Sequence, residues 1–264
     1  MEQSQMKRKY DKALLSCGIV GLVLMVYSTI YAGIASWGNL TAGNIFWNFW
    51  TMICEMFPPD FTALKNLGKP IIETLVMSVM ATVLAVLISF PLSFLAAKNV
   101  TPCYGLGVAV KALFSALRSI PELIMGVIFV AAVGFGILPG ILALGFHSIG
   151  MLGKFFAEAI EKVDPGLCEA VEASGGSRFH VIIYSIVPQI FTHSVDYALY
   201  RWEYNFRAST VVGLIGAGGL GFEIIAALRL IQYRDICAIL MVVFVLVQMV
   251  DCFGNMIRKH LMAE

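Results

Sequence analysis

Four polar residues that can carry charge or form strong hydrogen bonds lie close together in the last third of the chain. They are Arg201, Glu203, Asn205 and Arg207. Glu203 and Arg207 stand four positions apart with the acid first, which is the favourable order for an ion pair on a helix. Arg201 has no carboxylate three or four positions away. Its charge therefore requires an acid from another helix or an anionic ligand.

Two interpretations of these charges stay open. In the first, they neutralise one another inside a helical bundle and fix the register of its helices. In the second, Arg201 or Arg207 supplies positive potential for an anionic ligand. A tight bidentate contact would trap such an anion, so a transient contact is expected. The acids that could pair with Arg201 from other helices are Glu73, Glu122 and Asp251.

A glycine-rich motif, Gly216-Ala-Gly-Gly-Leu-Gly221, follows this stretch. It matches neither a P-loop nor a dinucleotide-binding motif, and no Lys follows it, so no nucleotide is expected to bind here. The expected role of Gly216, Gly218, Gly219 and Gly221 is close backbone packing or a broken helix at the outer gate of a pore. His147 and His193 are interpreted as hydrogen-bonded packing residues, and neither catalytic residues nor a metal site is expected.

The segment 158–188 contains start and stop signals for two short helices. Asp164-Pro165 combines a capping residue with proline at the first helical position. Gly175-Gly176 is a typical stop, so a helix of about ten residues is expected between them. Ser177 is expected to cap a second helix that ends before Pro188. Two such helices would form a compact acidic surface suited to a groove in a soluble partner, although a plain solvated loop has the same composition.

The elements that position these residues are membrane helices. Of the 264 residues, 59% are hydrophobic and only 13% are charged. No charged residue occurs in three long intervals, 13–54, 74–97 and 123–153. Each interval exceeds the roughly 20 residues that a helix needs to cross a bilayer. The chain is therefore predicted to be an all-α polytopic membrane protein, and its net charge of +1 argues against nucleic-acid binding.

Hydrophobic runs separated by charged residues and prolines predict about six transmembrane helices. They are Leu14–Ala35, Pro70–Ala96, Glu122–Gly134, Pro139–Phe156, Gln189–Arg207 and Asp235–Ile257. The third is expected to begin near Val108 with a kink at Pro121, and a tight turn is expected over 134–140. The aromatic-rich segment Trp37–Met56 is expected to lie along the outer membrane surface. If both termini are cytoplasmic, most Lys and Arg residues lie on the cytoplasmic side of the membrane. Because cytoplasmic loops are rich in these residues, this orientation is predicted.

The segment 158–188 resembles the cytoplasmic EAA loop of binding-protein-dependent ABC importers. Glu169, Ala170, Gly175 and Pro188 fall at the spacing of that motif. Val171, Ser185 and Val187 depart from it mildly. In that family the loop couples the permease to its ATPase, which implies a coupling role for Glu169, Ala170, Glu172, Ala173, Gly175 and Pro188.

The block from Tyr200 to Gly221 closely resembles the phosphonate branch of these permeases. Its glycine-rich end is shared with methionine and compatible-solute importers, and its arginine-rich front is typical of the phosphonate branch. The resemblance implies the type I importer fold of the methionine-permease kind. It further implies a permease for phosphonates or related oxyanions such as phosphite or hypophosphite, with Arg201, Glu203, Asn205 and Arg207 in the translocation path.

Several partners follow from the same resemblance. They are a second copy in a homodimer, two ABC ATPase subunits, a periplasmic or lipid-anchored binding protein, a small oxyanion, and lipid of a bacterial inner membrane. ATP and Mg would bind the ATPase, with no cofactor on this chain and no enzymatic activity of its own. The expected domains are 1–69, with the first span and interfacial segment, and the core permease 70–264.

Two other classes of protein remain as alternatives. An ion-coupled secondary transporter would need carboxylates or broken helices near the membrane midplane. An integral membrane enzyme acting on a phosphorylated substrate would need a Ser–His pair or paired carboxylates at one depth. Copurification of a cytosolic ATPase separates the importer from both.

Overall fold

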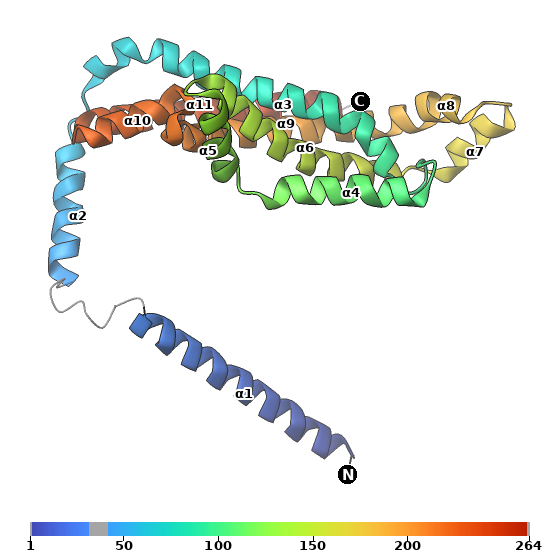
Figure 1. Cartoon of the computed structure of the whole chain (residues 1–264), viewed down its shortest axis with the longest axis horizontal. Coiled ribbons are helices and arrows are strands. Elements are labelled where there is room, and N and C mark those ends of the chain that lie inside the picture. The colour runs from blue at the N-terminus through green and yellow to red at the C-terminus, as the bar shows by residue number, and fades with distance from the viewer. Residues whose placement is uncertain (1, 32–41, 263–264) are drawn as a thin grey trace. The chain divides into compact units, whose positions relative to one another are not determined.

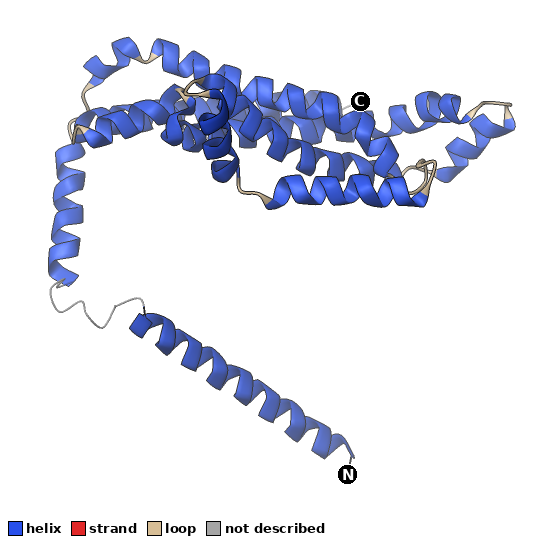
Figure 2. Cartoon of the chain, viewed as in Figure 1, coloured by secondary structure: helices blue, strands red, loops and turns tan. Residues whose placement is uncertain are grey.

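The computed structural model describes residues 2–31 and 42–262, and their regular structure is helical (Figure 2). The chain divides into two compact units, residues 1–55 and 56–264. The first unit contains α1 (Glu2–Tyr31) and most of α2 (Ala42–Met56). The apolar part of α1 is Gly18–Tyr31. The end of the first predicted span, Leu14–Ala35, therefore lies outside the described residues. The start of the predicted interfacial segment lies outside them too.

The second unit is a bundle of helices that carries every candidate site residue. Its elements are η2 (Phe61–Asn66), α3 (Gly68–Ala96), α4 (Tyr104–Ser119), α5 (Glu122–Val133), α6 (Ile137–Glu161), α7 (Pro165–Ala173), α8 (Arg178–Val181), η3 (Ile182–Ile186), α9 (Val187–Val212), η4 (Gly213–Ala217), α10 (Gly219–Arg229) and α11 (Tyr233–Met262). In Figure 1, α3, α6 and α9 run alongside one another, α4 lies beside α6, and α7 and α8 extend beyond one end of the bundle.

Three helices in the described part of the chain are long and apolar enough to cross a membrane. They are α3, α6 and residues 233–261 of α11. Two bent helix pairs raise the number of candidate spans to five if each pair is one span: α4 with α5, and residues 178–217 with α10. The prediction of a polytopic all-α membrane protein is confirmed. The predicted number of about six compares with three to five candidate spans among the described residues.

The pair α3 and α6 forms the centre of the bundle because small residues line its contact. Ala81, Ala85 and Ala143 are fully buried there. A Cβ atom added to Gly145 would lie 2.8 Å from Cδ2 of Leu84, so the helices approach closely where glycine leaves space. Small residues at such contacts are typical of membrane helices, which gain packing energy by close approach.

The predicted kink at Pro121 is confirmed and is sharp. The axes of α4 and α5 differ by 86° across it. Ile120, the residue before the proline, is extended with ψ 120°, because the proline ring disfavours helical geometry at the preceding position. The tight turn predicted over 134–140 is present but shorter, at 134–136, because α6 already begins at Ile137 and includes Pro139. Gly134 and Gly136 adopt φ values of 97° and 139°, which favour glycine.

The prediction that a helix ends before Pro188 is wrong. The chain continues from α8 through the π-helical turn η3 into α9, and Pro188 lies in the first turn of α9. In η3 the Val187 amide donates to the Ile182 carbonyl, five residues back. Proline cannot donate a backbone hydrogen bond, and a wide π turn in the residues before it accommodates that missing donor. Two short helices are therefore replaced by one short helix and one long, bent one.

Candidate functional site

The centre of the bundle contains a buried arginine held by two polar residues of α6. Arg201 of α9 is 1% exposed. Its Nε donates to Ser148 Oγ at 2.8 Å, and its Nη2 lies 2.7 Å from His147 Nδ1. The guanidinium carbon also lies 4.3 Å from the centroid of the Tyr204 ring, one turn further along α9. Because arginine has no acceptor atoms, these contacts make His147 Nδ1 a hydrogen-bond acceptor.

Asn205 extends this network to α3. It lies one turn after Arg201 and is fully buried. Its side-chain amide donates to Thr82 Oγ1 at 2.9 Å, and its carbonyl oxygen accepts from Ser148 Oγ at 3.0 Å. A chain of hydrogen bonds thus joins α3, α9 and α6. Because buried polar groups without partners are costly, this network fixes the register of the three helices.

The charge of Arg201 is not matched by a carboxylate in direct contact. None of the ion pairs among the described residues includes Arg201. Glu122 is connected to it through Tyr204, whose hydroxyl donates to Glu122 Oε1. The other carboxylate oxygen of Glu122, Oε2, is buried and has no hydrogen-bond partner among the described residues. The network therefore holds a buried cation and an incompletely satisfied anion on either side of one tyrosine ring.

A pocket of about 530 Å³ opens beside this network. Its polar lining consists of Glu122, His147, Tyr204 and Arg207. The remainder is apolar and comes from α5 and the last turns of α9. Such a volume is in the range of small-ligand sites, in which a few polar groups are placed within an apolar wall. Positive and negative side chains together could bind an oxyanion that also has a hydrogen-bond donor.

The predicted ion pair between Glu203 and Arg207 is wrong, although both residues pair with α11. Arg207 Nη1 donates to both carboxylate oxygens of Asp251, at 2.8 and 3.1 Å. Glu203 Oε1 accepts from Arg258 at 2.8 Å, and Arg258 also binds Asp196 at 2.8 Å. A side chain at Gly254 would place its Cβ 2.0 Å from Glu203 Oε1, so glycine provides the space for this pairing. Cross-helix partners therefore replace the pair on one helix.

Of the three acids expected as partners of Arg201, none contacts it directly. Glu122 approaches it through Tyr204, and Asp251 pairs with Arg207. Glu73 accepts from the Gly219 amide at 3.0 Å at the start of α10. The functional residues that the sequence did not indicate are Tyr204, Ser148 and Thr82. Tyr204 could have been found from its position three residues after Arg201, whereas the other two come from distant helices.

The four glycines lie where α9 gives way to α10. Gly216, Gly218 and Gly219 have positive φ values of 100°, 82° and 69°. The axes on the two sides of this break differ by 56°. A Cβ added to Gly221 would lie 1.9 Å from the Thr210 carbonyl oxygen. Glycine is thus required here both for backbone conformation and for close approach.

The segment between α6 and α9 has the geometry of a small exposed projection. Asp164 caps α7 by accepting from the Gly166 amide at 2.9 Å, with Pro165 as its first residue. The helix ends at Ala173, and Gly175 follows with φ 83°. These findings confirm the predicted start and stop. Among the predicted coupling residues, all six are exposed: Glu169, Ala170, Glu172, Ala173, Gly175 and Pro188.

The other face of α7 attaches it to the bundle. Cys168 and Val171 pack against a cluster of buried residues that includes Val181, Ile186 and Ile190. The Asp164 amide donates to Gln189 Oε1 at 2.8 Å, which ties the start of α7 to the start of α9. A force applied to α7 would therefore reach α9, the helix that carries Arg201.

Comparison with known proteins places these features in context. The family model described as the inner membrane component of binding-protein-dependent transport systems matches residues 89–260. The phosphite transport system permease protein PtxC of Stutzerimonas stutzeri is 47% identical over 251 residues, covering 95% of this chain and 86% of that protein. The phosphate-import permease protein PhnE of Mycolicibacterium smegmatis is 40% identical over 215 residues, covering 81% of this chain and 40% of that protein.

A solved structure shows the same fold. A chain of the MetNI methionine ABC transporter in an inward-facing conformation matches with a TM-score of 0.67 and 20% sequence identity. The match covers 76% of this chain and 99% of that chain. The expected methionine-permease kind of fold is confirmed.

Proposed function

The chain belongs to the family of inner membrane components of binding-protein-dependent transport systems, and on this premise we propose that it moves phosphite, phosphonates or related phosphorus oxyanions across the membrane. As a permease it is a non-catalytic subunit of an ABC importer. The observation that carries the proposed substrate class is Arg201, a buried cation that no carboxylate contacts in the described part of the chain, beside a pocket with Arg207 and His147. The functions for which the two permease relatives are named, phosphite transport and phosphate import, support the same class.

The translocation path proposed for this substrate follows α9. Arg207 lines the pocket, Arg201 lies behind it, and Glu203 and Asn205 hold the helix to α11 and α3. Because Asp251 already binds Arg207, an anion there would meet a partly screened charge and could leave again. Sites that bind weakly in succession allow passage, whereas one tight site would stop it. The glycine break at Gly216–Gly221 would serve as the outer gate.

The pore would form between two copies of this chain, each with one ATPase below α7. Glu169 and Glu172 would enter a groove of the ATPase together with the small residues Ala170 and Ala173. ATP and Mg would be bound by the ATPase, and an external binding protein would deliver the anion. ATPase closure would move α7, and α9 would follow through the contacts of Asp164 and Cys168. In this arrangement both termini face the cytoplasm of a bacterium.

The experiment that tests the substrate class is uptake by the complete transporter in vesicles. We expect unlabelled phosphite, methylphosphonate or phosphate to reduce uptake of labelled phosphite when supplied with the binding protein, whereas sulfate and methionine at equal concentration leave it unchanged. Near neutral pH, phosphite, methylphosphonate and phosphate share a phosphorus–oxygen group that still carries a proton to donate, which Glu122 at the pocket could accept, whereas sulfate carries no such proton and methionine has no such group. Uptake of methionine and no uptake of any phosphorus oxyanion would refute the proposed substrate class.

A further inference from the structure

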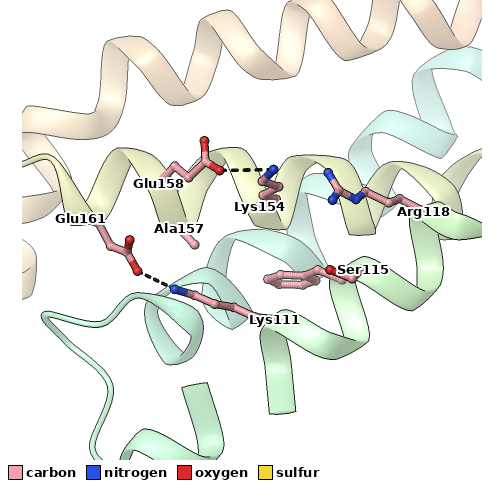
Figure 3. Close-up of a pocket in the computed structure, with 8 residues that line it drawn as sticks. Lys111, Ser115, Arg118, Lys154, Ala157, Glu158 and Glu161 are labelled. Atoms are coloured by element: carbon pink, nitrogen blue, oxygen red, sulfur yellow. Dashed lines mark hydrogen bonds and ion pairs between the residues drawn. The ribbon is translucent and has the colours of Figure 1, made fainter. Parts of the chain in front are cut away.

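A second cavity lies between α4 and α6 and is separate from the pocket beside Arg201. It has a volume of about 290 Å³. We call it the α4–α6 cavity and define it by its polar lining: Lys111, Ser115, Arg118, Lys154, Glu158 and Glu161. In Figure 3, Lys111 and Glu161 meet between the two helices, while Lys154 and Glu158 lie along α6 and Arg118 reaches toward them from the α4 side. Nothing in the proposed mechanism has used this cavity so far.

The charges of the α4–α6 cavity do not balance. Lys111 pairs with Glu161 at 2.7 Å, and Lys154 pairs with Glu158 at 3.5 Å. Arg118 takes part in none of the ion pairs found in the described residues. In Figure 3 its guanidinium points along α6 toward the ammonium of Lys154. Arg118 and Lys154, both exposed, line the same cavity, and an anion between two such cations would offset their repulsion.

The close packing of α4 on α6 holds the charged residues of the two helices at this cavity. A Cβ at Gly153 would lie 2.3 Å from the Phe114 ring, and one at Gly150 would lie 2.6 Å from the Phe114 carbonyl oxygen and 2.9 Å from the Arg118 amide. Phe114 itself is buried. The two glycines thus allow α4 to lie directly against α6. This contact places Arg118 and Lys154 at the same cavity.

The α4–α6 cavity lies in series with the pocket beside Arg201. Along α6, His147 lines that pocket, while Lys154 and Glu158 line the cavity at seven and eleven positions further on, which is the same helix face. At 1.5 Å per residue these positions are about 10–16 Å nearer the α7 end. On the other wall, Arg118 and Glu122 stand on either side of the bend at Pro121, one lining each site.

We propose that the α4–α6 cavity is a second oxyanion site, which receives the phosphorus oxyanion after it leaves the pocket beside Arg201 and before it enters the cytoplasm. Arg118 and Lys154 would bind its oxygens, and the Ser115 hydroxyl would donate a hydrogen bond. Glu158 and Glu161 pair with Lys154 and Lys111 and limit the net positive charge, so the contact stays reversible. This proposal rests on the proposed function, because the ligand is the transported anion.

This proposal is tested by measuring phosphite binding to the complete chain in phosphatidylcholine nanodiscs. A phosphorus NMR titration follows the binding. Arg118→Gln removes the charge, Arg118→Lys keeps it, and Arg229→Gln removes the same charge from the exposed end of α10. We expect Arg118→Gln to lower the affinity of one phosphite site about tenfold or more, as for the loss of a charge-assisted contact. Arg118→Lys should retain most of the affinity, and Arg229→Gln should match the unmodified chain.

The outcomes distinguish this proposal from the proposed function. If the unmodified chain binds phosphite and Arg118→Gln binds it equally well, the second site is refuted while the proposed substrate class stands. If the unmodified chain binds no phosphorus oxyanion and the complete transporter takes none up, the proposed function itself fails. If Arg118→Gln loses only bound phosphatidylglycerol, in discs that contain this lipid, the cavity is a lipid headgroup site and the proposal is overturned.

Discussion

Replacement of Glu169 by lysine is expected to release the ATPase and to lower uptake about 100-fold or more. Glu169 is exposed on α7, and no residue of this helix is buried. Reversal of a charge in a desolvated contact removes one attraction and creates a repulsion, which together cost several kcal/mol in comparable interfaces. Copurification of the ATPase with the tagged chain measures docking, and uptake by the same cells measures coupling.

Glu55→Lys is the matched control for this experiment. Glu55 is also exposed, takes part in no ion pair of the described residues, and lies outside the coupling segment. We expect its charge reversal to leave copurification and uptake within about twofold of the unmodified chain, as for most surface substitutions. Because α7 contributes no buried side chain, Glu169→Lys should yield a folded chain with unchanged elution and helicity. An ATPase that stays bound to the Glu169→Lys chain would exclude α7 as the docking element.

Replacement of Arg201 by glutamine is expected to lower uptake about 100-fold while the ATPase still copurifies. The substitution removes the buried charge and shortens the side chain, so Ser148 and His147 lose their donor. It also removes a buried cation from beside Tyr204, which still donates to the part-buried Glu122 carboxylate. Buried polar groups that lose a partner cost about 1–3 kcal/mol. Loss of uptake alone would therefore fit either a role in transport or a role in structure.

The double variant Arg201→Gln/Glu122→Gln separates these two roles. It restores charge balance because the cation and its tyrosine-linked anion are removed together. Thermal unfolding should then return toward that of the unmodified chain. If Arg201 attracts the passing anion, uptake stays low in this stable double variant. Recovery of uptake together with stability would make Arg201 a structural residue, as would unchanged uptake in the single variant with intact assembly.

Local signals allowed the coupling segment to be predicted from the sequence. The cap at Asp164, the proline after it and the positive φ of Gly175 depend on neighbours within a few residues. The kink at Pro121 was predictable for the same reason. Its 86° bend was not, because the final angle depends on how α5 packs against α6 and α9. The prediction of a helix end before Pro188 was wrong because a π turn can accommodate a proline within a continuous helix.

The partners of the charged residues of α9 could not be predicted from the sequence. The spacing of Glu203 and Arg207 favours a local pair, yet their partners come from α11, 55 and 44 residues away. Tertiary contacts therefore outweighed a pair on one helix. Likewise, His147 was expected to be a packing residue, and it is hydrogen-bonded, but the sequence did not place it against Arg201 or at the pocket. Only the fold brings α6 and α9 together at this depth.

Uptake into vesicles that contain the purified chain with and without its ATPase tests the central claim most directly. The central claim is that the chain is a gate without an energy source of its own, driven through α7. With ATPase, ATP and binding protein present, labelled phosphite should accumulate inside against its gradient, and omission of the ATPase should abolish this accumulation. Accumulation against a gradient by the chain alone, driven by an ion gradient or by no added energy source, would contradict the account.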